Sequence, residues 1–194
     1  MAIFAYESRV DAPLSTVWEF HATTDGLEAL TPSWMGLSVD VIRGPHGDHP
    51  EILVVGSIVE LSVRPFGVGP RQRFVSEIVE RHATPEVRLD TPRQSSAGDG
   101  PSRASSNAEV PRASFVDVQR AGPFDSWRHA HLFTAVDGGT RCIDHIEYTL
   151  PYGSLGEAAQ PAFVLVFERL FRARHARLGE LLERPSTPTE RTPS

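Results

Sequence analysis

The sequence predicts an α+β fold in which a curved antiparallel sheet of about seven strands wraps around one long C-terminal helix. Three observations predict this arrangement. Most of the chain between residues 37 and 151 alternates between apolar and polar residues, which is typical of strands. Short turns rich in Gly and Pro join these segments, and such turns favour antiparallel pairing. One long helical pattern, at residues 155–183, is available to cover the inner face of the sheet.

The first elements are a strand and two short helices. Residues 2–10 alternate strictly, so they predict a strand with its more aromatic face inward. Asp11 is a candidate N-cap, and Pro13 lies in the first turn of the helix that follows. A second short helix is predicted at residues 25–30, where a proline soon ends the pattern.

Six further strands are predicted after the helices. They are expected at residues 37–43, 52–64, 71–82, 113–124, 126–136 and 141–151. The sequence Asp-Gly-Gly supplies a hairpin turn between the last two strands. Residues 88–111 are rich in Ser, Gly and Pro and poor in apolar residues, which predicts a flexible loop insertion. Residues 184–194 predict a disordered tail, so 1–183 is expected to form a single domain.

Composition excludes several function classes. The net charge is −6, and all 19 basic residues are Arg, so a nucleic-acid partner is not expected. No apolar run approaches about 18 residues, and the N-terminus lacks the pattern of a signal peptide, which predicts a cytoplasmic protein without a membrane span. The single cysteine, Cys142, excludes an internal disulfide and a zinc site built from several cysteines.

Three stretches resemble a known superfamily. They are FVDVQRAGPFDSWRHAHLF from residue 115, DHIEYTLPYGSLG from residue 144, and FRARHARL from residue 171. The set is similar to the START-like superfamily, also called SRPBCC, and within it to a ligand-binding subfamily related to polyketide cyclase/dehydratase-like proteins. The third stretch departs from that pattern, since it offers Phe-Arg where the subfamily carries Tyr-Arg. The resemblance implies a helix-grip fold that binds its ligand between the sheet and the long helix.

Three predicted strands direct polar groups to a common place. Every second residue of a strand lies on the same face. This rule places Asp117 on one inner face, His129 and His131 on the next, and Asp144 on the third. Trp127 and Phe133 flank the two histidines on the same face, and Tyr148 shares a face with Asp144. We therefore expect the two carboxylates and the two imidazoles to lie close together.

The long helix adds a charged residue to this region. Phe163 and Phe167 lie on its apolar side, and Arg174 falls about 20° from Phe163 when residues advance by about 100°. An arginine on a buried stripe needs a partner, because an unpaired buried charge is costly. The sequence predicts that Arg174 pairs with Asp144 or Asp117.

Four roles remain open for the histidine pair: a hydrogen-bonded structural network, ligand contact, metal ligation and acid/base catalysis. Two histidines two residues apart can form a metal site together with a carboxylate. Because Arg174 at the same place would repel a dication, no metal is predicted, and no cofactor motif is present. His129, His131 and Asp144 are the candidate catalytic residues if the protein is an enzyme.

The leading prediction is a protein that binds a hydrophobic or amphipathic small molecule, without assured catalysis. The predicted ligand-binding residues are Trp127, His129, His131, Phe133, Asp117, Asp144, Tyr148, Phe163, Phe167 and Arg174. One alternative is a cyclase/dehydratase-type enzyme with a His–Asp acid/base pair. Another is an interaction or regulatory protein with a closed cavity, which could form a homodimer through an exposed strand edge.

Overall fold

The computed structural model describes residues 1–87 and 110–183. The described residues form one sheet of seven antiparallel strands, in the order β1-β7-β6-β5-β4-β3-β2. The strands are β1 (Ala2–Val10), β2 (Ser38–Arg43), β3 (Ile58–Val63), β4 (Gln72–Ala83), β5 (Arg112–Ala121), β6 (Ser126–Val136) and β7 (Gly139–Thr149). The α-helices are α1 (Leu14–His21), α2 (Thr24–Leu30) and α3 (Ser154–Leu182), and three short 3-10 helices are η1 (Ser33–Met35), η2 (Pro65–Gly67) and η3 (Pro85–Val87).

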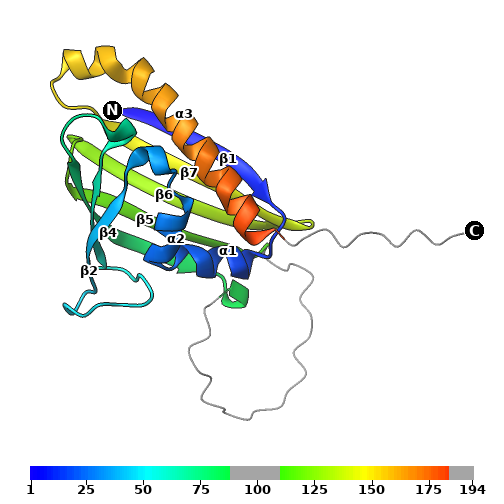
Figure 1. Cartoon of the computed structure of the whole chain (residues 1–194). Coiled ribbons are helices and arrows are strands. Elements are labelled where there is room, and N and C mark those ends of the chain that lie inside the picture. Colours follow the sequence, from blue (N-terminus) through cyan, green and yellow to red (C-terminus); the bar gives the residue numbers. More distant parts are fainter. Residues whose placement is uncertain (88–109, 184–194) are drawn as a thin grey trace, which may run out of the picture.

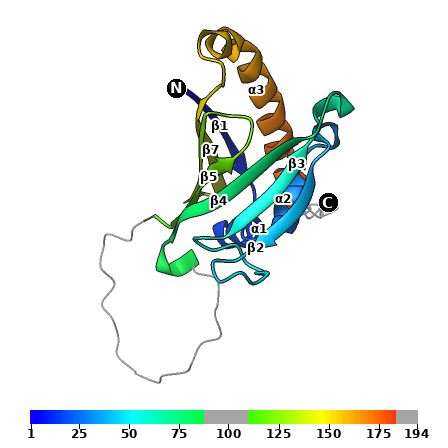
Figure 2. The same cartoon turned by 90° about the vertical axis from the view of Figure 1, so that its left-hand side faces the viewer.

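The helices cover one face of the curved sheet. α3 crosses the strands on that face, and α1 and α2 lie beside its C-terminal half (Figure 1). The side view shows the sheet curving around the helices (Figure 2). α1 packs against β5, β6 and β7, while α2 packs against α3 and β2. The predicted order of elements and the predicted architecture are therefore confirmed.

The inner face of β6 connects two apolar clusters. Trp127 packs with the aromatic cluster beneath the first half of α3, which includes Tyr148 and Phe167. Phe133 packs with a second cluster, which includes Trp18 of α1. The two histidines of the strand lie between these two residues in the sequence and are buried. A polar layer therefore separates two apolar parts of the core, at the centre of the sheet.

Two local predictions are wrong. The strand expected at residues 52–64 covers only Ile58–Val63. Gly56 has a φ of 88°, and the backbone N–H of Val54 donates to Ser57 Oγ at 2.9 Å, so a turn replaces the first half of that strand. The N-cap of α1 is Pro13 rather than Asp11, which forms an ion pair with Arg9 instead.

The sequence also predicts a loop insertion, a tail and the absence of a membrane span. Most of the predicted loop insertion and all of the predicted tail, residues 88–109 and 184–194, lie outside the described residues. None of the helices in the described ranges is long and apolar enough to cross a membrane.

Cys142 is expected to be unreactive in the folded protein. Its side chain is buried on β7, and burial, with a smaller contribution from the charge of Asp144, raises the pKa of the thiol to about 12. A disulfide reagent such as DTNB at mildly alkaline pH should leave the native chain unmodified. The same reagent should modify one thiol per chain in denaturant, and rapid native modification would contradict the burial.

Candidate functional site

The strand register brings the predicted polar residues together. Asp117 of β5 pairs with His129 of β6, and His131 of β6 pairs with Asp144 of β7. Each histidine therefore has one carboxylate directly across from it and the other on a diagonal. All four side chains are at most 14% exposed.

Asp144 is the centre of this cluster. Its Oδ1 accepts a hydrogen bond from His129 Nε2 at 2.7 Å and lies 2.8 Å from His131 Nδ1. Its Oδ2 accepts from His175 Nε2 of α3 at 2.5 Å. The second nitrogen of His175, Nδ1, lies 2.6 Å from Ser8 Oγ on β1. One carboxylate thus joins β1, β6, β7 and α3.

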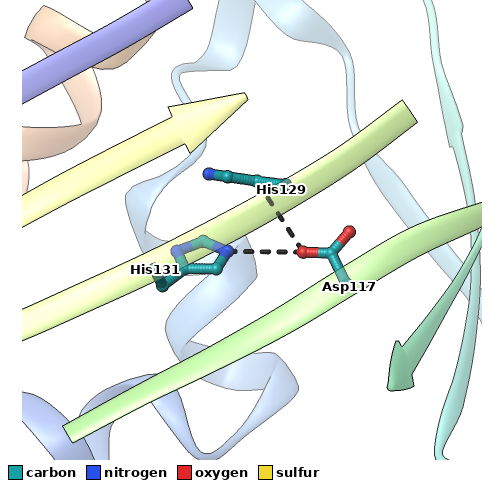
Figure 3. Close-up of side chains that lie close together, drawn as sticks. All are labelled: Asp117, His129 and His131. Atoms are coloured by element: carbon teal, nitrogen blue, oxygen red, sulfur yellow. Dashed lines mark ion pairs between the residues drawn. The ribbon is translucent and has the colours of Figure 1, made fainter. Parts of the chain in front are cut away.

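Asp117 occupies the other side of the two histidines. Its Oδ1 accepts a hydrogen bond from Ser76 Oγ of β4 at 2.8 Å. Its Oδ2 faces both imidazoles, 3.4 Å from His131 Nε2 and 3.7 Å from His129 Nδ1 (Figure 3). These two separations exceed the usual range for hydrogen bonds between nitrogen and oxygen.

The predicted pairing of Arg174 with Asp144 or Asp117 is wrong. Arg174 donates a hydrogen bond to Thr31 Oγ1, which follows α2, at 3.2 Å, and among the described residues no carboxylate lies within 4 Å of it. Its neighbour His175 contacts Asp144 instead. The two residues border opposite flanks of the buried stripe of α3, one facing α2 and the other facing β1. A helical pattern identifies such border positions but does not say which neighbour lies on each flank.

The charges within the cluster and its burial shift the pKa values of its side chains. Burial opposes the charged form of Asp144, but His131 and the hydrogen bonds from the histidines outweigh it, so the pKa of Asp144 lies well below its ordinary value. Burial likewise opposes ionisation of Asp117, yet His131 and His129 lower the pKa of this carboxyl. Burial and the charge of His131 lower the pKa of His129. Burial also disfavours the charged form of His131, but the two carboxylates raise its pKa overall.

A pair of unsatisfied polar atoms lies beside the cluster. Trp127 and Tyr148 face each other across β6 and β7, and both Trp127 Nε1 and Tyr148 Oη are buried without a hydrogen-bond partner among residues 1–87 and 110–183. The ring of Phe167 lies 5.8 Å from that of Trp127 and 5.1 Å from that of Tyr148. Buried donors are nearly always satisfied in native proteins, so this pair indicates a place where a further molecule can bind.

The remaining predicted ligand residues divide between the two apolar clusters. Phe163 and Phe167 lie near Trp127, whereas Phe133 lies on the α1 side of the histidines. The sequence did not identify His175, Ser8 or Ser76 as members of the polar cluster. Ser8 gave a usable signal, because it shares the inward face of β1 with the aromatic residues.

Two open hollows on the surface lie away from Trp127 and Tyr148. The larger, of about 640 Å³, is lined by Glu7, Ser8, Arg9, Val136, Asp137 and Arg141. The other, of about 460 Å³, lies on the outer side of α3 and is lined by Leu165, Glu168, Arg169, Arg172, Ala173 and Ala176. The internal cavity that the sequence predicts between sheet and helix stays a prediction.

His21 is expected to make stability depend on pH. It ends α1, its Nδ1 donates to Val17 O, and burial lowers its pKa to about 3, with His131, Asp144 and Arg174 as the nearby charges. The unfolded chain binds a proton below a pKa of about 6.5, whereas the folded chain does not until about 3, so stability is lost as the pH falls through this window. Between about pH 7 and pH 5 the free energy of unfolding of the natural chain should fall, and in His21→Gln this fall should be smaller by about 1–2 kcal/mol. The partial exposure of the side chain keeps the effect in this modest range. Urea denaturation of both chains at each pH measures this difference, and parallel pH profiles would contradict it.

The fold and its interior define the class of protein. An open antiparallel sheet holds a long C-terminal helix, which is the helix-grip arrangement, and a polar cluster lies inside it. Residues 10–178 match the family model described as polyketide cyclase / dehydrase and lipid transport. The chain belongs to this family, and the predicted SRPBCC-type resemblance is confirmed.

Solved structures share this fold at low sequence identity. TTHA0849 from Thermus thermophilus has a TM-score of 0.58 and 15% identity, with 96% of this chain and 100% of that chain covered. CV1439 from Chromobacterium violaceum has a TM-score of 0.56 and 13% identity, with 94% and 98% covered. Ms6760 from Mycobacterium smegmatis has a TM-score of 0.55 and 18% identity, with 96% and 93% covered. No curated protein matches the chain.

Proposed function

We propose that this protein binds a hydrophobic or amphipathic small molecule between the sheet and α3. The observation that carries the proposal is a pair of buried polar atoms, Trp127 Nε1 and Tyr148 Oη, that have no hydrogen-bond partner in the described part of the chain. They lie within a cluster of mostly apolar side chains, which includes Phe4, Phe167 and Phe171. Family membership supports the proposal, because the family description includes lipid transport.

The two atoms define the polar part of the ligand. An indole N–H can only donate a hydrogen bond, and a phenol can donate or accept. A carbonyl, carboxylate or hydroxyl oxygen between them would satisfy both, while the rest of the ligand contacts Phe167 and its aromatic neighbours. An unsatisfied buried donor costs about 1–3 kcal/mol, so a ligand that supplies an acceptor recovers part of this energy.

The contacts of the histidines favour binding over acid/base catalysis. Both nitrogens of His175 contact protein oxygens. His129 and His131 each have one nitrogen at Asp144 and the other directed at Asp117. A general base needs a nitrogen that the substrate can reach, and the nitrogens directed at Asp117 are buried within the cluster. The cyclase/dehydratase role therefore has less support, and the homodimer and the cytoplasmic location stay predictions.

The test is a binding screen with matched variants. Fatty acids and aromatic carboxylic acids are screened by thermal shift, and isothermal titration calorimetry then measures the dissociation constant of the best ligand. Trp127→Phe and Tyr148→Phe each remove one polar atom and keep an aromatic ring. We expect each to weaken binding about 10-fold, while the melting temperature of the free chain stays equal or rises.

Tyr152→Phe is the control, because Tyr152 is 83% exposed and lies outside the cluster. It should leave the dissociation constant unchanged. Two results would contradict the proposal: no compound shifts the melting temperature, or the Trp127→Phe/Tyr148→Phe double variant binds as tightly as the natural chain.

A further inference from the structure

Three lone-pair atoms face one another inside the polar cluster. They are Asp117 Oδ2, His129 Nδ1 and His131 Nε2, and all lie within 4.8 Å of one another (Figure 3). Each atom comes from a different side chain on two neighbouring strands, β5 and β6. The arrangement is buried at the centre of the sheet, so water from bulk solvent does not compete for it freely.

The opposite side of the cluster fixes the protons of both histidines. An ionised carboxylate oxygen only accepts hydrogen bonds, and Asp144 Oδ1 lies 2.7 Å from His129 Nε2 and 2.8 Å from His131 Nδ1. Both of these nitrogens must therefore carry a hydrogen. In the neutral imidazoles, His129 Nδ1 and His131 Nε2 are then bare acceptors that face a third acceptor, Asp117 Oδ2. Three acceptors in contact repel one another unless a cation lies between them.

We propose that Asp117, His129 and His131 bind a divalent transition-metal ion, with Zn²⁺ as the best match to two imidazoles and one carboxylate. Such a set of three protein ligands leaves a coordination position for a water or another ligand. The inference goes beyond the small-molecule role proposed above and does not depend on it.

The separations fit a metal better than direct hydrogen bonds. Ligand atoms bonded at about 2.0–2.1 Å to a tetrahedral Zn²⁺ lie about 3.3–3.4 Å apart. The observed separations of 3.4 and 3.7 Å from Asp117 Oδ2 are close to this value.

The surrounding contacts resemble the outer shell of a metal site. Histidines that bind metals usually donate their other N–H to a carboxylate, and here Asp144 accepts from His129 Nε2 and lies 2.8 Å from His131 Nδ1. The second oxygen of Asp117 accepts from Ser76, which fixes the orientation of the carboxylate. His175 and Ser8 in turn hold Asp144 in place.

The expectation of no metal came from the repulsion of a dication by Arg174 at the same place. Arg174 donates to Thr31 and forms no ion pair with either carboxylate in the described part of the chain, so its side chain does not fill the position between Asp117 and the histidines. The charges of Asp144 and Asp117 both act on Arg174, and these two carboxylates offset its repulsion of a cation. A proton on His131 is the competing occupant, because it would convert one contact with Asp117 into a long hydrogen bond. That proton would leave His129 Nδ1 without a donor at 3.7 Å, whereas one metal ion satisfies all three atoms.

Metal titration of the untagged full chain distinguishes a bound metal ion from a proton on His131. The protein is treated with EDTA, dialysed and titrated with Co²⁺ and then Zn²⁺. We expect visible d–d absorption bands at one Co²⁺ per chain, displacement of Co²⁺ by Zn²⁺, and a higher melting temperature with Zn²⁺. Asp117→Asn and His131→Gln should each weaken binding at least about 100-fold.

Control variants separate this site from adventitious binding. His145→Gln removes a histidine from the outer face of β7 and should bind Co²⁺ as the natural chain does. His46→Ala/His49→Ala removes two histidines of the β2–β3 loop, and metal binding that is lost there but kept in Asp117→Asn would overturn the proposal. The absence of Co²⁺ bands and of a Zn²⁺-dependent melting shift in the natural chain would also overturn it, in favour of a proton. Circular dichroism of Asp117→Asn checks that its loss of binding is not loss of folding.

Discussion

Replacement of Asp144 by alanine is expected to lower the free energy of unfolding by about 3–5 kcal/mol, the usual cost of removing one partner from a buried charged network. His129 and His175 would lose their shared acceptor, and His131 would lose the carboxylate 2.8 Å from its Nδ1. The N–H groups would remain buried, because the side chains that surround them on β1, β6 and α3 stay in place.

Asp144→Asn removes the negative charge of the side chain and keeps its shape. The amide keeps one oxygen that can accept, but its NH₂ group would face either His175 or the pair on β6 with a donor against a donor. We expect a loss of stability comparable with that of alanine. Urea denaturation in the presence of EDTA, followed by circular dichroism, measures both variants without a contribution from bound metal.

Asp125→Ala is the matched control for this change. Asp125 is exposed and precedes β6, so its removal should change the free energy of unfolding by no more than about 0.5 kcal/mol. If Asp144→Ala costs less than about 1 kcal/mol, Asp144 does not hold the cluster together.

Replacement of Phe167 by alanine is expected to cost about 3–5 kcal/mol, as for other large buried aromatic residues. The Phe167 ring is 5% exposed and packs against Phe4 of β1, Tyr148 of β7 and Trp127 of β6. Its removal would leave a cavity beneath α3, because strands in a continuous sheet cannot close around the lost volume.

The control for this change lies on the same helix. Leu165 is 66% exposed on the outer side of α3, so Leu165→Ala should change stability by less than about 0.5 kcal/mol. Chemical denaturation of both variants gives the comparison. Similar losses for the two variants would mean that α3 is not anchored to the sheet by its inner aromatic residues.

The fold could be predicted from the sequence because its signals are local. Alternation identified the strands, and short turns from β5 to β6 and from β6 to β7 required antiparallel neighbours there. The inward direction of Asp117, His129 and Asp144 followed from the same alternation. Pairing of neighbouring strands then brought these residues together without any information from distant parts of the chain.

The rest of the site depends on distant contacts that no local pattern carries. Arg174 and His175 are adjacent in sequence and border opposite flanks of the same stripe, and only the positions of α2 and β1 decide which of them reaches Asp144. The prediction of a strand over residues 52–64 is wrong for a different, local reason. Its apolar composition suits a strand, but a tight turn at Gly56 makes the chain change direction there.

The hydrogen bond between Ser8 and His175 has a consequence for synthesis on the ribosome. It joins residues 167 positions apart, and both flank Asp144, to which His175 is bonded. A nascent chain that has emerged only as far as β7 carries the buried carboxylate and its two strand histidines but not the last partner. The native arrangement can therefore form only after α3, which supplies His175, has left the exit tunnel.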